Sequence, residues 1–177
     1  GVQGAVIGVH HGYTRLSGRW GHARMLARLA DAWVVVDRVW PMDPGQAKPV
    51  SIRLHWQLAP GVARKTETGL WLEASPVKCH LSFAAGDGKV EFQLAEGSNS
   101  PIDGWSSRYY NHRQPVPAVN LTACTSREHW FASVFAARVT DVRFDIDGKK
   151  LVFEDSYRVP LNILQRLSTE MLGQLLH

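Results

Sequence analysis

Hydrophobic and polar residues alternate with a period of two along most of the chain. Ile52, Leu54 and Trp56, for example, are separated by polar residues. The same alternation returns in four further segments, at residues 77–83, 90–94, 119–123 and 142–146. Because successive side chains on a strand point to opposite faces, each segment predicts a strand with one buried face. The turn sequences between them are Gly86-Asp87-Gly88, Asp147-Gly148 and a loop from Pro41 to Pro49. Many short alternating strands separated by turns predict an all-β chain, an antiparallel β-sandwich.

Residues 22–33, HARMLARLADAW, are ambiguous because their apolar residues also fit helical spacing. Asp31-Ala32 falls between two similar runs, and the following WVVVDRVW is rich in β-branched residues. We therefore predict a β-hairpin over residues 23–40.

The C-terminal segment follows a different period. After Pro160, apolar residues recur every three or four positions, at Leu161, Leu164, Leu167, Met171, Leu172 and Leu175. This spacing predicts an amphipathic helix over residues 160–177 with proline in its first turn. We expect the helix to pack on a sandwich formed by residues 1–159. A homodimer contact through the helix is the alternative.

The chain has 177 residues, of which 45% are hydrophobic, enough for one sizeable core. Its longest apolar run is about five residues, too short to span a bilayer, and its first residues lack the features of a signal peptide. Cys79 and Cys124 permit one disulfide, although the alternating pattern around Cys79 also fits a reduced thiol in the core.

The net charge of +4 and the pI of about 9.3 favour an anionic partner. The sequence has no Lys/Arg run, zinc-finger spacing or basic helix, which argues against nucleic acid. An acidic polysaccharide is the remaining anionic partner. A slightly basic surface without a charged partner is the alternative.

The sequence predicts neither a metal site nor a nucleophilic centre. His10, His11 and His22 are close in sequence, but they lack the spacing of zinc ligands, and His10 and His11 would point to opposite faces of a strand. No GxSxG, phosphate loop or opposed carboxylate pair is present either.

Two segments are candidates for glycan binding. The segment GWSSRYYNHRQPVP, at 104–117, is predicted to be a loop, and its aromatic rings can stack on sugars while its arginines pair with carboxylate or sulfate. Its candidate residues are Trp105, Arg108, Tyr109, Tyr110 and Arg113. Alternatively, Trp105 and one tyrosine fill the edge of the sandwich. In VHHGYTRL, at 9–16, we expect His11 and Arg15 to lie near the glycan, and Tyr13 and Leu16 to be structural.

The order of several motifs resembles the C-terminal β-sandwich of the heparinase II/III-like polysaccharide lyases over residues 8–137. These motifs are HHGYTRL, VVVDRV, LHWQLAPG and GWSSRY followed by alternating prolines. The resemblance implies a supersandwich-like fold joined in the parent protein to an N-terminal α/α-toroid. It also implies β-elimination on polysaccharides that contain uronic acids.

No residue of this chain matches a catalytic or metal-binding motif of that family. We therefore expect a domain that supports the catalytic cleft and is inactive alone, with no cofactor of its own. A structural metal such as zinc would be held elsewhere in the parent. The family analogy favours a periplasmic or secreted location. The alternatives are a stand-alone carbohydrate-binding module and a structural or dimerisation domain.

Overall fold

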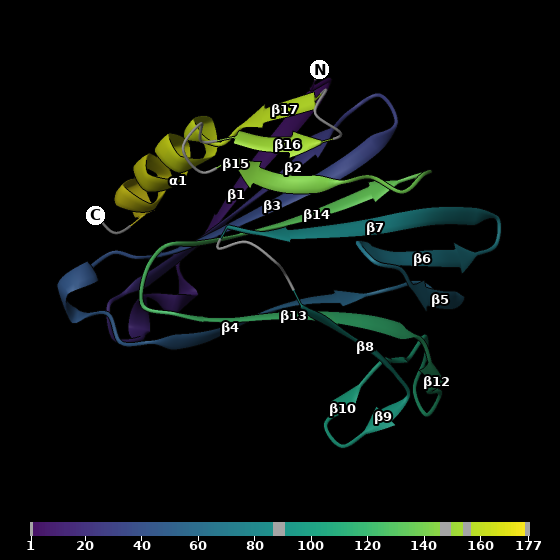
Figure 1. Cartoon of the computed structure of the whole chain (residues 1–177). Helices are drawn as coiled ribbons and strands as arrows, with labels where there is room; N and C mark the ends of the chain where they lie inside the picture. The colour runs from purple at the N-terminus through teal and green to yellow at the C-terminus, as the bar shows by residue number, and fades with distance from the viewer. Residues whose placement is uncertain (1, 87–90, 146–149, 154–156, 176–177) are drawn as a thin grey trace.

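The computed structural model describes residues 2–86, 91–145, 150–153 and 157–175. Seven antiparallel strands form a central sheet in the order β1-β2-β3-β14-β7-β6-β5 (Figure 1). Their bounds are Gly4–His10 (β1), Trp20–Arg28 (β2), Ala32–Pro41 (β3), Val62–Lys65 (β5), Gly69–Ala74 (β6), Val77–Ala85 (β7) and His129–Ala136 (β14). Among the described strands, β1 and β5 are therefore the edges of this sheet.

The predicted hairpin over residues 23–40 is confirmed as β2 and β3. Ala27 pairs with Val34, and Met25 pairs with Val36. The backbone N–H of Leu29 donates to the carbonyl of Ala32 at 2.9 Å and closes the turn. The helix-like spacing of residues 22–33 is misleading because alternate positions, Ala23, Met25 and Ala27, are fully or nearly fully buried on one face.

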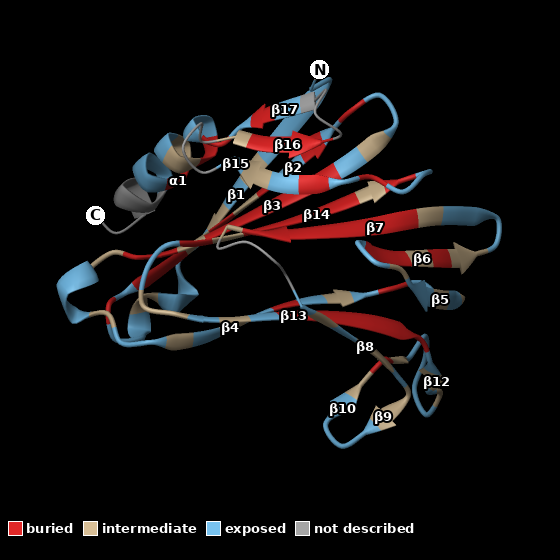
Figure 2. Cartoon of the chain, in the orientation of Figure 1, coloured by how far each residue is buried: buried red, intermediate tan, exposed pale blue. Residues whose placement is uncertain are grey.

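A smaller sheet covers one face of the central sheet, and its strands lie in the order β4-β13-β8. They span Val50–Gln57 (β4), Pro117–Thr125 (β13) and Phe92–Glu96 (β8). Between the two sheets lies an apolar cluster that includes Leu54, Leu121, Leu81 and Phe131. Figure 2 shows this buried layer between β13 and β7. The predicted all-β sandwich is thus confirmed.

The opposite face of the central sheet is covered by a three-stranded sheet and by the only helix longer than a single turn among the described residues. The strands are Val142–Asp145 (β15), Lys150–Phe153 (β16) and Tyr157–Pro160 (β17), and the helix is Asn162–Leu175 (α1). Leu151, Phe153 and Leu164 pack there against Val34 and Val36 of the central sheet. The central sheet is therefore covered on both faces. No described helix is long and apolar enough to cross a membrane.

The buried Arg38 of β3 anchors α1 to the central sheet. Its guanidinium donates to the Gln165 carbonyl at 3.1 Å and to the Ser168 hydroxyl at 2.8 Å. Glu128 accepts a further hydrogen bond from Arg38, and the guanidinium lies over the Trp40 ring at 4.1 Å. Packing of the helix on the sheet, which the sequence predicts, thus depends on a buried charge as well as on leucines.

The start of the helix differs from the prediction. Pro160 is the last residue of β17 and pairs with Lys150, and α1 begins at Asn162. Val159 is buried in the sheet beside it, so strand packing and not helical spacing decides the conformation here. The side chains of Leu172 and Leu175 lie outside the described part of the structure.

The predicted loop at 104–117 contains a short β-hairpin instead. Trp105–Ser106 (β11) pairs with Gln114–Pro115 (β12), and the backbone N–H of Val116 donates to the Gly104 carbonyl. Just before it, Ser98–Asn99 (β9) pairs with Ile102–Asp103 (β10). We call residues 98–116 the flap. Gly104, with φ of +67°, links its two hairpins.

Between β3 and β4, the predicted loop holds one turn of 3-10 helix, Pro44–Gln46 (η2). The predicted turns at Gly86-Asp87-Gly88 and Asp147-Gly148 lie outside the described residues. Cys79 and Cys124 are both free thiols in the structure, so the alternative of a reduced thiol holds.

Candidate functional site

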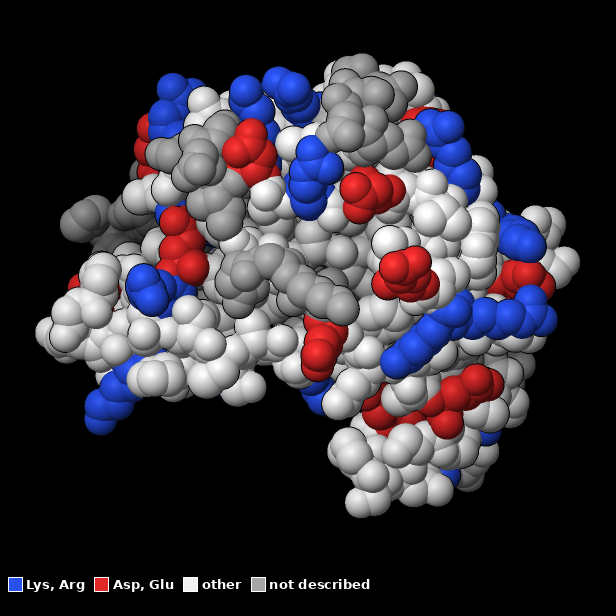
Figure 3. All heavy atoms as spheres, viewed as in Figure 1, with Lys and Arg blue, Asp and Glu red and all other residues white. Residues whose placement is uncertain are grey.

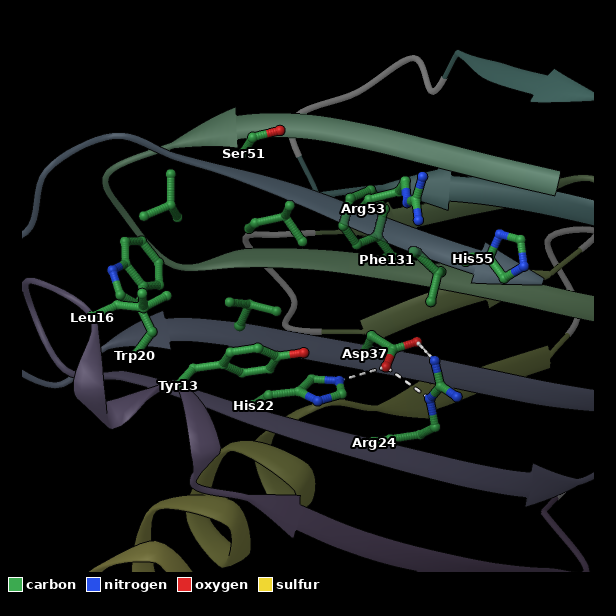
Figure 4. A pocket seen from close by; sticks show the side chains of 14 residues that line it. Tyr13, Leu16, Trp20, His22, Arg24, Asp37, Ser51, Arg53, His55 and Phe131 are labelled. Carbon is green, nitrogen blue, oxygen red and sulfur yellow. Dashed lines mark hydrogen bonds and ion pairs between the residues drawn. The ribbon is translucent and has the colours of Figure 1, made fainter. Parts of the chain in front are cut away.

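A cleft opens where the central sheet and the smaller sheet diverge. Its walls come from β2 and β3 on one side, from β4 on the other, and from the single 3-10 turn Gly12–Arg15 (η1) at one end (Figure 4). The cavity has a volume of about 280 Å³, which approaches the size of a small-molecule site.

The β2–β3 wall carries a buried carboxylate that forms hydrogen bonds with two basic side chains. Asp37 is only 2% exposed, and its Oδ1 lies 2.8 Å from Nε2 of His22 and 2.8 Å from Nε of Arg24. A terminal nitrogen of Arg24 also donates to Asp37 Oδ2 at 3.1 Å. These bonds satisfy the buried charge and fix both bases in place.

The register of the hairpin brings these three residues together. His22 and Arg24 alternate with Ala23 along β2, so both point away from the buried core on the helix side. Arg24 pairs with Asp37 across the two strands. Arg24 also lies over the Trp56 ring of β4 at 5.0 Å. Its second terminal nitrogen remains free of Asp37 and, because the side chain is 40% exposed, can reach an acceptor in the cleft.

The opening segment VHHGYTRL contributes aromatic groups to the same wall. The Tyr13 and His22 ring centroids lie 6.3 Å apart, and those of Tyr13 and His10 lie 5.0 Å apart. Figure 4 shows the Tyr13 hydroxyl directed toward His22 and Asp37. Tyr13 is 42% exposed, so its hydroxyl is available to a ligand as well as to these neighbours.

The opposite wall combines apolar residues with three polar residues of β4, Ser51, Arg53 and His55 (Figure 4). Ile52 and Leu54 of β4 line it together with Phe131 of β14, and Leu16 and Trp20 close the end near η1. A cleft that combines apolar residues with convergent polar groups suits a sugar, because a sugar ring has apolar C–H faces and polar edges.

The cleft does not fit a resident metal ion. Within the described residues, no group of three or more His, Cys, Asp and Glu side chains can hold a metal. His22 and Asp37 are adjacent, but Arg24 shares the same carboxylate and places a positive charge where a cation would sit.

The predicted binding residues fall into two separate groups. His11 and Arg15 are exposed at η1 but do not line the cleft, whereas Tyr13 and Leu16 do. The other five predicted residues lie in the flap and are Trp105, Arg108, Tyr109, Tyr110 and Arg113. Figure 1 shows η1 and the flap near opposite ends of β4. A glycan-binding role for either group remains a prediction.

Within the flap, the structure brings together only some of the predicted residues. Arg113 stacks on the Trp105 ring at 3.8 Å, so the arginine covers one face of the indole. Tyr109 contacts the ring of His112, whereas Tyr110 is 94% exposed. The indole N–H of Trp105 donates to the Ser98 carbonyl at 2.7 Å and fixes the ring within the flap.

Arg24, Asp37, Arg53 and His55 line the cleft but were not predicted as site residues from the sequence. One signal could have identified Asp37, because a lone carboxylate inside the apolar run WVVVDRVW must be paired if it is buried. The pairing partner follows once the register of the hairpin is fixed. On α1, Ile163 and Met171 are exposed, and the alternative of a homodimer contact through the helix remains untested.

Comparison with solved structures shows which proteins share this fold. Heparinase III, the BT4657 gene product, matches with a TM-score of 0.63 and 14% identity over 89% of this chain and 25% of its own. A form of that protein with methylated lysines matches with a TM-score of 0.59 and 15% identity over 80% of this chain and 21% of its own. This chain therefore spans about a quarter of the length of these proteins and shares their fold over that part.

At the level of sequence, no family model matches the chain. No curated protein matches it either.

Proposed function

We propose that this chain is the β-sandwich domain of a polysaccharide lyase that acts on polysaccharides containing uronic acids. The domain forms part of the substrate cleft and is inactive by itself. In such a reaction, a base removes the proton beside the uronate carboxyl group, the bond to the leaving oxygen breaks, and an acid protonates that oxygen. The product is an unsaturated sugar.

The observation that carries the proposal is the wall formed by Tyr13, His22, Arg24 and Asp37 in a fold shared with heparinase III. The free terminal nitrogen of Arg24 suits a sugar carboxylate, and the Tyr13 hydroxyl suits a ring hydroxyl. Because Asp37 holds Arg24 with two hydrogen bonds, the guanidinium is oriented before the ligand arrives.

The proposal implies partners that follow from the resemblance to the family. A helical α/α-toroid of the same polypeptide faces the cleft, and an acidic polysaccharide binds between the two domains. The site of action is the periplasm or the cell exterior, where such polymers occur. This chain contributes no cofactor.

The test uses the full natural polypeptide and uronate polymers, with absorbance of the new carbon–carbon double bond as the readout. We expect the unsaturated product from at least one polymer and none from the isolated chain. Tyr13→Phe should lower kcat/KM about fivefold, the effect of losing one hydrogen bond of about 1 kcal/mol. Its thermal midpoint should stay unchanged because the ring is retained.

Thr68→Val is the matched control, because it also removes one exposed hydroxyl group, on the turn between β5 and β6, and does not line the cleft. It should leave kcat/KM unchanged on short oligosaccharides. The absence of unsaturated product from all uronate polymers would rule out the proposed function.

A further inference from the structure

The outer face of the smaller sheet is polar on β4, whereas Ala118 and Asn120 on the same face of β13 are buried. Cross-strand pairs place Arg53 beside Thr122, His55 beside Asn120, and Asn120 beside Gln93. The remaining outward residues of the three strands are Ser51, Gln57, Ala95, Ala118 and Cys124. None of the outward strand residues is an acid, and Arg53 is the one residue among them with a permanent charge.

The flap forms a wall at one end of this face. Figure 3 shows the flap projecting beyond the rest of the molecule, so that the outer side of β4 and β13 is recessed beside it. Gln57 donates to the backbone carbonyl of Trp105 at 3.1 Å, and Asn120 donates to Asp103. These two bonds fix the flap to β4 and to β13.

Arg113 presents a positive charge from this wall. Its guanidinium is held by the Trp105 ring and by a hydrogen bond of 3.5 Å to Asn99 Oδ1, which leaves donors free. Within the described residues, neither Arg113 nor Arg53 has a carboxylate partner. By contrast, the nearby Asp103 is already bonded to Asn120 and to the backbone N–H of Gly104.

We propose that this outer face is a second glycan-binding site that adjoins the cleft at the edge strand β4, where Arg53 belongs to both, and that it takes an extended acidic polysaccharide. Arg53 and Arg113 bind two separate carboxylate or sulfate groups of the chain, and the amide of Gln93 binds a hydroxyl group between them. Arg53 lies four residues from Gln57, and thus about 13 Å along β4 from the start of the flap. Only a chain several sugars long reaches both arginines. The choice of an acidic polysaccharide as ligand rests on the proposed function.

The experiment is calorimetric titration of the isolated chain with octasaccharides of heparan sulfate and of polymannuronate, and with neutral maltooctaose. We expect binding of the acidic chains only. Arg53→Gln and Arg113→Gln should each weaken binding roughly fivefold, as expected for one partly exposed ion pair, and together roughly 25-fold. Arg127→Gln, at an exposed arginine on a turn, is the matched control and should leave affinity unchanged.

Two further variants distinguish this site from the wall of the cleft that carries Tyr13, and from misfolding. Arg53→Lys retains the charge and should recover part of the affinity, which a folding defect would not allow. Tyr13→Phe should leave binding by the isolated chain unchanged. Equal losses in Arg127→Gln and Arg53→Gln, or full affinity in the double variant, would overturn the second site. If the full polypeptide yields no lyase product, the proposed function is wrong. The titration of the isolated chain would still test the second site.

Discussion

Single charged or polar groups inside an apolar layer explain much of this structure. Asp37 and Arg38 are neighbours on β3, yet they point to opposite faces of the central sheet. Asp37 organises the cleft, whereas Arg38 holds α1. Both are almost completely buried, and each has charge-assisted hydrogen bonds that offset the loss of hydration.

His80 is the buried base that should make stability depend on pH. It is fully buried, with its ring nitrogens 3.0 Å from the hydroxyl oxygens of Ser82 and Thr66. Ser82 donates its own proton to the Thr140 carbonyl, so its oxygen accepts from Nδ1 of His80, and Nε2 accepts from Thr66. Desolvation lowers the pKa of His80.

A lowered pKa means that the unfolded chain binds the proton more readily than the folded chain. The stabilisation is therefore complete above the ordinary histidine pKa of about 6.5 and is lost as the pH falls below it. We expect the free energy of unfolding, measured with urea, to fall between about pH 7.5 and about pH 5.5. His80→Gln should reduce this difference. The exposed His11 provides the control His11→Gln, and an equal reduction there would contradict the assignment.

At the scale of elements, the connection between α1 and the central sheet is the most specific contact. Leucines alone would allow the helix to slide or rotate, but Arg38 contacts the backbone carbonyl of Gln165 and the hydroxyls of Ser168 and Thr169. These bonds set the position of the helix along its axis.

Arg38→Met should therefore release α1. The variant keeps most of the apolar volume but leaves the acceptors on α1 without their donor, and we expect a loss of about 3 kcal/mol in the free energy of unfolding. Amide hydrogen exchange in residues 162–171 should become faster. Arg166→Met, which removes an exposed pair with Glu170, should cost under about 0.5 kcal/mol. Unchanged exchange in Arg38→Met would show that apolar packing alone holds the helix.

Sequence patterns are sufficient to predict some strands and not others. Alternation identifies β4, β7 and β13 because apolar residues recur at every second position. The expectation that the polar face is exposed is wrong for β7, where His80 and Ser82 are buried because the central sheet is covered on both faces. Alternation predicts a loop at 104–117 because β11 and β12 have only two residues each, too few for a period. The pairing of Trp105 with Pro115 depends on the closing bond between Val116 and Gly104, which no local pattern encodes.

At the scale of the whole molecule, the sequence predicts the sandwich but not the cleft. The cleft exists because two sheets of different width are stacked, and sheet width depends on which strands pair. His22, Arg24 and Asp37 meet Ile52 and Leu54 only through that stacking. The order of motifs resembles a lyase family, and the fold shared with heparinase III agrees with that resemblance.

The open edge of the central sheet also affects how the isolated chain behaves in solution. The sequence of β1, GAVIGVH, has no Lys, Arg, Asp, Glu or proline, and Val6 on this strand is 72% exposed. Charged residues and prolines on edge strands normally prevent edge-to-edge pairing between molecules. Their absence predicts reversible self-association that rises with concentration in sedimentation velocity experiments.

Val6→Lys should suppress this association without a loss of thermal stability, whereas Val62→Lys, at an exposed position on the short opposite edge strand β5, should have a smaller effect. Equal association of wild type and Val6→Lys would place the contact elsewhere. If the edge is the cause, then backbone groups left unpaired at β1, more than the net charge of +4, limit the concentration at which this domain stays monomeric.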